Sequence, residues 1–74
     1  MTDQEKLEFI RSAMIEVFKK PKDFVVRPTD LLPELGFDSL DIVELQMYYE
    51  EQTGKNTPND ARIISVSDLM EIME

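Results

Sequence analysis

The sequence predicts an all-α domain, a small four-helix bundle with three main helices and one short helix. Three segments carry apolar residues at helical spacing, and capping residues precede them. Strand signals are nearly absent, since the apolar run at 23–26 is the one candidate and a single short run cannot form a sheet. With 74 residues, the chain is expected to form one domain, 1–74, with a small core.

The first helix is expected to begin after Thr2, because Thr2 and Glu5 stand at the spacing of a capping box. Pro21 ends the pattern, since proline cannot continue a helix interior. Between them one apolar stripe follows helical spacing, formed by Leu7, Ile10, Met14, Val17 and Phe18.

A long connection then runs from Pro21 to Asp38 and includes a turn at Gly36. Connections of this length without regular structure are uncommon and are often functional. Four apolar residues are expected to hold it against the bundle: Leu31, Leu32, Leu35 and Phe37.

The second helix is expected to run from about Ser39 to Thr53, with Gly54 as its C-terminal stop. A rotation of about 100° per residue divides its apolar residues into two groups on roughly opposite sides. A bundle this small cannot bury both groups, so one is expected to form an exposed strip next to acidic residues, unless loop residues cover it. The inner group is Ile42, Leu45 and Tyr49 with Tyr48 at its edge, and the outer group is Leu40, Val43 and Met47 beside Glu44, Glu50 and Glu51.

Two shorter helices are expected towards the C-terminus. Thr57 as a cap, Pro58 at the first helical position and Asp60 in the first turn predict a brief third helix. Ser65 and Asp68 stand at capping spacing before the last helix. Its apolar face is formed by Val66, Leu69, Met70 and Met73.

Composition excludes several classes of function. Sixteen acidic and eight basic residues give a net charge of −8, which opposes binding to nucleic acid or anionic membranes and favours basic partner proteins. Many small proteins are also acidic simply because net charge keeps them in solution. The chain has no cysteine and no histidine, so no disulfide, serine triad or usual zinc site can form, and any thiol must be attached from outside. Without a membrane-length apolar run or signal-peptide features, we expect a cytoplasmic monomer.

Ser39 has two interpretations. It can be a simple helix-start residue, because serine is a common cap. Alternatively, its hydroxyl can accept a modification, since a helix start favours an anion such as a phosphodiester. Asp38 and Asp41 flank it and could help a modifying enzyme hold a cation, and Gly36 permits close approach by that enzyme.

The stretch LGFDSLDIVELQMYYEE resembles the signature of acyl carrier proteins. The resemblance covers nearly the whole chain, through the helix order, the long proline-containing loop and the motif Asp38-Ser39-Leu40-Asp41. It implies that Ser39 receives 4′-phosphopantetheine from coenzyme A, with Asp38 and Leu40 as flanking site residues and no metal site or catalytic residue in the chain itself. The thiol of the group would carry acyl intermediates of fatty-acid, polyketide or related biosynthesis as thioesters.

The resemblance also implies partners and two further surfaces. The partners would be a phosphopantetheinyl transferase, which uses Mg²⁺, and acyl-loading and acyl-processing enzymes with basic docking patches. The implied partner surface is Leu40, Asp41, Val43, Glu44, Met47, Glu50 and Glu51. The implied acyl cleft is Leu31, Leu32, Ile42, Leu45, Tyr49, Ala61, Ile64 and Leu69.

Some residues depart from the usual fatty-acid type. Thr53 and Thr57 stand where apolar residues are common, the segment from Pro58 to Ser65 looks short, and Tyr48 and Tyr49 add bulk and hydroxyl groups. These changes predict a smaller or more polar cleft, and hence a specialised carrier for a short, polar or aminoacyl cargo.

Three alternatives remain. The chain could be an acidic interaction module that docks through its second helix and is never modified. A hydrolase is disfavoured, because Phe37 interrupts the Gly-Asp-Ser-Leu order and no histidine is present. A carrier domain excised from a multimodular synthase is the third, although Met1 shortly before a capped helix favours a free-standing protein.

Overall fold

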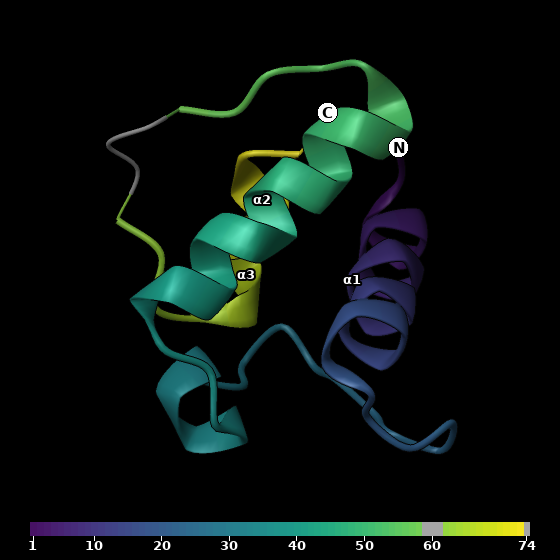
Figure 1. The fold of residues 1–74 in the computed structure, drawn as a ribbon, viewed down its shortest axis with the longest axis vertical. Coiled ribbons are helices and arrows are strands. Elements are labelled where there is room, and N and C mark those ends of the chain that lie inside the picture. Colours follow the sequence, from purple (N-terminus) through teal and green to yellow (C-terminus); the bar gives the residue numbers. More distant parts are fainter. Residues whose placement is uncertain (59–61, 74) are drawn as a thin grey trace.

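The structure, a computed structural model that describes residues 1–58 and 62–73, is an all-α bundle. In chain order its elements are α1 (Asp3–Phe18), the 3-10 helix η1 (Leu32–Leu35), α2 (Ser39–Thr53) and α3 (Val66–Glu71). Helix α1 contacts both α2 and α3, so it is the element that joins the bundle (Figure 1). The predicted fold class is therefore confirmed.

Each α-helix begins with a capping box, in which a side-chain oxygen accepts from the N–H group three residues later and that residue's carboxylate accepts in return. The second box begins at Asp38, so the cap of α2 is the aspartate before Ser39. Helix α1 stops at Phe18, because Lys19 adopts a left-handed conformation with φ of 61°. The three boxes are Thr2–Glu5, Asp38–Asp41 and Ser65–Asp68.

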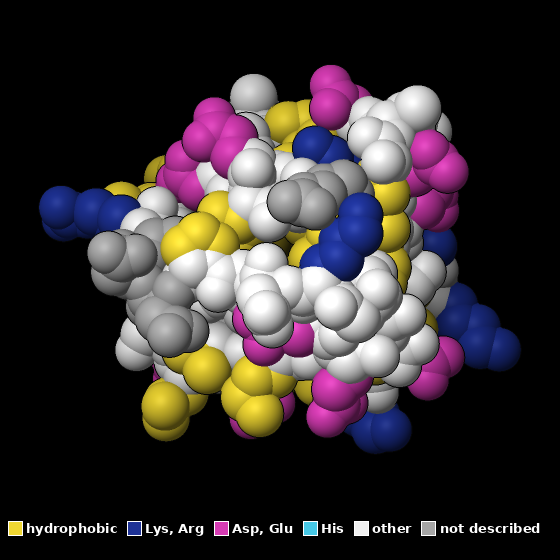
Figure 2. Space-filling model, turned by 90° about the horizontal axis from the view of Figure 1, so that it is seen from above, with side chains coloured by type: hydrophobic (Ala, Val, Ile, Leu, Met, Phe, Trp, Pro, Cys, Tyr) yellow, Lys and Arg dark blue, Asp and Glu magenta, His cyan; other side chains and the backbone are white. Residues whose placement is uncertain are grey.

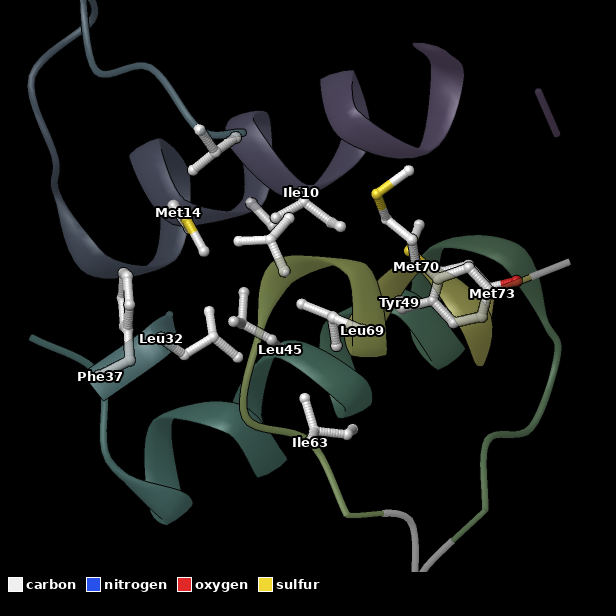
Figure 3. Close-up of a cluster of buried hydrophobic side chains, with 13 residues drawn as sticks. Ile10, Met14, Leu32, Phe37, Leu45, Tyr49, Ile63, Leu69, Met70 and Met73 are labelled. Carbon is white, nitrogen blue, oxygen red and sulfur yellow. The ribbon is translucent and has the colours of Figure 1, made fainter. Parts of the chain in front are cut away.

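A single cluster of buried apolar side chains lies among the three α-helices and the connection before α2 (Figure 3). From the predicted stripe of α1, Ile10 and Met14 are buried, while Leu7 and Phe18 are partly buried against the cluster. The whole predicted face of the last helix is buried. The cluster consists of Ile10, Ala13, Met14, Val26, Leu32, Phe37, Leu45, Tyr49, Ile63, Val66, Leu69, Met70 and Met73.

The connection before α2 is held largely by backbone hydrogen bonds to the segment that enters α3. The Leu32 N–H donates to Ile64 O at 2.8 Å, and the Val66 N–H donates to Asp30 O at 2.9 Å. Leu32 is fully buried, whereas Leu31 is 40% exposed. The prediction that the Leu31 side chain holds the connection is therefore wrong, because its backbone forms an isolated bridge with Ser65 and its side chain faces outward.

The short helix of the bundle lies in an unexpected place. Residues 32–35 form η1 within a connection that was predicted to be irregular. The predicted third helix falls largely on residues 59–61, outside the described residues; Thr57 and Pro58 before it and residues 62–64 after it are not helical. The Thr57 side chain is hydrogen-bonded to Gln46 and Glu50 of α2.

Candidate functional site

Ser39 is the first residue of α2, and its side chain is exposed. The preceding residue, Asp38, performs the capping: the Asp41 N–H donates to Asp38 Oδ1 and the Asp38 N–H donates to Asp41 Oδ2, both at 3.0 Å. Across the described residues, the Ser39 hydroxyl has no hydrogen bond. Because capping occupies Asp38 instead, the Ser39 hydroxyl is open to chemistry from solvent.

The start of α2 suits a negative group on Ser39. The first N–H groups of a helix have no intrahelical acceptors, and Asp38 takes only that of Asp41. The N–H groups of Ser39 and Leu40 belong to the first turn of α2, at the positive end of the helix dipole, which favours an anion attached to the Ser39 oxygen. The local donor set fits the phosphate of 4′-phosphopantetheine.

An open groove begins at Ser39. Gly36 adopts a φ of 93°, and a Cβ atom built there would meet no atom within 4 Å, so the space beside it is clear. Apolar side chains form much of the groove, which gives a flexible arm on Ser39 a surface to lie against. The lining residues are Pro33, Gly36, Phe37, Asp38, Ser39, Ile42 and Ile63.

The outer stripe of α2 is open. Leu40 is 73%, Val43 48% and Met47 54% exposed, so the alternative in which loop residues cover this stripe is wrong. Glu44 and Glu51 beside it are also exposed. Hydrophobic side chains with acidic neighbours are visible at the lower edge of the face in Figure 2.

Two acidic residues of the expected partner surface are less open than the others. Asp41 is half-buried and takes part in the capping box of α2. Glu50 is half-buried, and its Oε2 accepts from the Thr57 N–H at 2.8 Å and from the Thr57 hydroxyl at 2.9 Å. Both bonds lower the pKa of Glu50 from its ordinary value of 4.5, the backbone N–H contributing more. The Glu50 carboxylate is therefore directed to the loop after α2.

The interior holds a cavity of about 10 Å³. Of the expected cleft residues, only Leu45, Tyr49 and Leu69 line it. The other lining residues come mainly from α1 and from the two residues that follow α3. Sequence reasoning did not assign them to a cleft. They are Phe9, Ile10, Ala13, Gln46, Thr57, Ile72 and Met73.

The remaining cleft residues lie elsewhere. Leu32 is buried in the core away from the cavity lining, and Ile42 lines the groove at Ser39. Ile64 is 45% exposed, and Ile63 points into the core in its place (Figure 3). The expectation that Ile64 lies in the cleft is therefore wrong, and its neighbour Ile63 faces inward to the core and the groove at Ser39, since neighbouring residues of an extended segment face opposite ways. Leu31 is exposed, and Ala61 lies outside the described residues.

Gln46 could have been found from the sequence. It lies four residues after Ile42 and three before Tyr49, so helical spacing places it on the inner face of α2. A polar residue among the apolar residues of this inner face was the signal that could have identified it. Its amide donates to Thr57 Oγ1 and to Pro58 O, both at 3.1 Å.

Neither a metal centre nor a membrane span is evident in the described part of the chain. Within residues 1–58 and 62–73, no group of three or more acidic, histidine or cysteine side chains could hold a metal ion. Over the same residues, no helix is long and apolar enough to cross a membrane.

Comparison with known proteins gives one consistent result. Residues 8–73 match the family described as "Phosphopantetheine attachment site". The chain is 36% identical to an acyl carrier protein of Zymomonas mobilis over 69 residues, which cover 90% of this chain and 88% of the relative. It is 33% identical to an acyl carrier protein of Campylobacter hominis, over 95% and 91% of the two chains. The crystal structure of an acyl carrier protein from Thermotoga maritima is similar with a TM-score of 0.83, at 25% identity, covering 93% of this chain and 82% of that one.

Proposed function

This chain belongs to the acyl carrier protein family, and we propose that Ser39 is the residue to which 4′-phosphopantetheine is attached. The family carries its cargo on a prosthetic group and is non-catalytic. When bound, that group supplies the thiol that holds an acyl group as a thioester, which the chain's own composition cannot provide. The observation that carries the proposal is the exposed Ser39 hydroxyl at the start of α2, with its neighbour Asp38 performing the capping.

The residues around Ser39 have separate tasks in this proposal. The Asp38–Asp41 box fixes the first turn of α2 and so the position of the hydroxyl. The free N–H groups of that turn stabilise the phosphodiester. During attachment the Ser39 oxygen bonds to phosphorus of the coenzyme A pyrophosphate, the bond to adenosine 3′,5′-bisphosphate breaks, and the transferase accepts the hydroxyl proton.

The partners we propose are a phosphopantetheinyl transferase and enzymes that load and process the acyl group. The exposed stripe Leu40, Val43 and Met47, with Glu44 and Glu51 beside it, suits a partner with an apolar patch ringed by lysine or arginine. Mutation of Met47→Glu should slow transfer by such an enzyme, whereas Gln52→Glu on an exposed position of the same helix should not. Equal rates for both variants would argue against this docking surface.

We further propose residues 1–74 as one carrier domain that works in the cytoplasm, as expected for the family, on a short, polar or aminoacyl cargo. The small cavity and the polar side chains of Gln46 and Thr57 in its wall support this class of cargo. A long hydrocarbon chain would not find the volume that it needs, and it would meet the polar side chains of Gln46 and Thr57 in a wall that is otherwise largely apolar.

Intact-mass measurement tests the attachment site. The unaltered chain, Ser39→Ala and Ser12→Ala are incubated with coenzyme A, Mg²⁺ and a broad-specificity transferase. The unaltered chain and Ser12→Ala, which removes an exposed serine from α1, should gain the mass of one phosphopantetheinyl group, and Ser39→Ala should gain none.

Two results would overturn the proposed site. A mass gain in Ser39→Ala would place the attachment elsewhere. An unchanged mass of the unaltered chain, beside a control carrier that is modified, would favour the unmodified interaction module.

A further inference from the structure

Four hydrogen bonds join the middle of α2 to the loop that follows it. The Gln46 amide donates to Thr57 Oγ1 and to Pro58 O, and Glu50 Oε2 accepts from the N–H and the hydroxyl of Thr57. We call the three side chains Gln46, Glu50 and Thr57 the polar clasp. Thr57 is only 9% exposed, so the clasp draws a polar residue from the loop into the interior.

The clasp lies in the wall of the interior cavity. Gln46 and Thr57 line that cavity together with Leu45, Tyr49 and Leu69. A volume of about 10 Å³ is close to the minimum that admits one water molecule, so no alkyl chain fits without movement of a wall. Leu45 and Tyr49 are buried in the core, which fixes α2, and most lining residues from the other helices are buried there too: Ile10, Ala13, Leu69 and Met73. The wall that can move is therefore the loop held by Thr57.

Movement of that wall is opposed by the chemistry of the clasp. The two bonds to the Glu50 carboxylate are charge-assisted, which makes them stronger than bonds between neutral groups. An entering alkyl chain would break them and leave the Gln46 amide and the Thr57 hydroxyl against methylene groups, where their hydrogen-bonding groups have no partner. A chain of methylene groups offers no hydrogen bond in return.

We propose that the polar clasp is the specificity determinant that keeps long aliphatic chains out of this bundle. The inference rests on the proposed attachment at Ser39 and adds the residues that select the cargo. A long alkyl chain on the arm stays outside the bundle, and a short or polar cargo needs no opening of the wall.

The test compares the unaltered chain with the double variant Gln46→Val/Thr57→Val, which removes three of the four bonds and makes the wall apolar. Each protein is loaded from acetyl- or octanoyl-coenzyme A by a broad-specificity transferase, and intact mass confirms the load. The unaltered chain should melt at the same temperature with either group. In the double variant octanoyl should raise Tm by about 4–8 °C over acetyl, because buried methylene groups stabilise the fold.

Two further measurements keep the test independent of how well the double variant folds. Methyl NMR signals of Ile10, Leu45 and Leu69, which line the cavity, should move on octanoyl loading only in the double variant. In the unaltered chain the Thr57 amide, bonded to Glu50, should be equally protected from hydrogen exchange with either cargo. Gln52→Val makes the same glutamine change at an exposed position of α2 and should behave as the unaltered chain.

Each contrary outcome identifies what failed. Octanoyl-dependent stabilisation, shifted cavity methyl signals or loss of Thr57 protection in the unaltered chain would overturn the clasp and leave attachment at Ser39 intact. A folded double variant that still excludes octanoyl would show that other residues select the cargo. Absence of any mass gain in the unaltered chain overturns the attachment itself, and the clasp inference with it, before any acyl comparison.

Discussion

Leu32→Ala should be among the most damaging single changes in the connection before α2. The Leu32 side chain is fully buried, its N–H donates to Ile64 O, and its carbonyl accepts from the Phe37 N–H at 3.0 Å. Removing buried methyl and methylene groups loses about 0.8 kcal/mol for each, and the cavity left behind adds to this, so the expected loss is about 3–4 kcal/mol. A domain of this size lies near the low end of roughly 5–15 kcal/mol of total stability, so most of its margin would disappear.

The assay is thermal and urea unfolding followed by circular dichroism, with Leu31→Ala as the matched control. Each kcal/mol lowers Tm by about 4–8 °C in a domain of this size, so Leu32→Ala should melt at least about 12 °C below the unaltered chain. Leu31 is 40% exposed, and its truncation should change stability by less than about 1 kcal/mol. Equal losses in the two variants would refute the view that the side chain of Leu32, and not that of Leu31, anchors the connection.

Three other predictions concern local features of the fold. Asp38→Ala removes the cap of α2 and should reduce stability by about 1 kcal/mol in urea unfolding. An unchanged urea midpoint would show that the cap does not stabilise the fold. Gly36→Ala should reduce stability by about 1–2 kcal/mol through its φ of 93° alone, because the added methyl group meets no atom. Gly36→Asn should lose less stability, because asparagine tolerates this backbone conformation better than alanine. A larger loss in Gly36→Asn than in Gly36→Ala would contradict backbone strain as the cause. The Thr57 N–H and hydroxyl lower the pKa of Glu50, so the contribution of Glu50 to stability is complete above the ordinary pKa of 4.5 and is lost as pH falls through the lower folded pKa. Over that acid range, the urea midpoint of the unaltered chain should fall more steeply with decreasing pH than that of Glu50→Gln. Parallel curves of midpoint against pH would count against this role of Glu50.

Sequence patterns predicted the helices well where local chemistry decides the structure. The capping boxes at Thr2 and Ser65, the bounds of α2 from Ser39 to Thr53 and the stop at Gly54 are all confirmed. These features depend on hydrogen bonds between residues close in the chain, so spacing alone reveals them. The exposure of Ser39 and of Leu40 followed from the same helical geometry.

Features that depend on contacts between distant segments were predicted less well. The bridge between Leu31 and Ser65 turns the Leu31 side chain outward, and nothing in the local sequence indicates that pairing. Because of the same pairing, Ile63 lies on the inner side of this segment, where Ile64 was expected. The brief helix predicted from Thr57, Pro58 and Asp60 lies largely outside the described residues. The hydrogen bonds of Thr57 to Gln46 and Glu50 could not be predicted, because they depend on how the loop after α2 folds back onto that helix.

The two ends of α2 are attached to the rest of the protein by different kinds of bond. Near Ser39, the Asp38–Asp41 capping box sets the first turn of α2, and main-chain amide and carbonyl groups of the flanking connections join one another, as in the bond from Leu32 to Ile64. Near Thr57 the attachments run through side chains, and a change of one or two residues rewrites them. On the two proposals made above, point mutations near Thr57 can alter which cargo the protein accepts and leave in place the bonds at the end where the prosthetic group is attached.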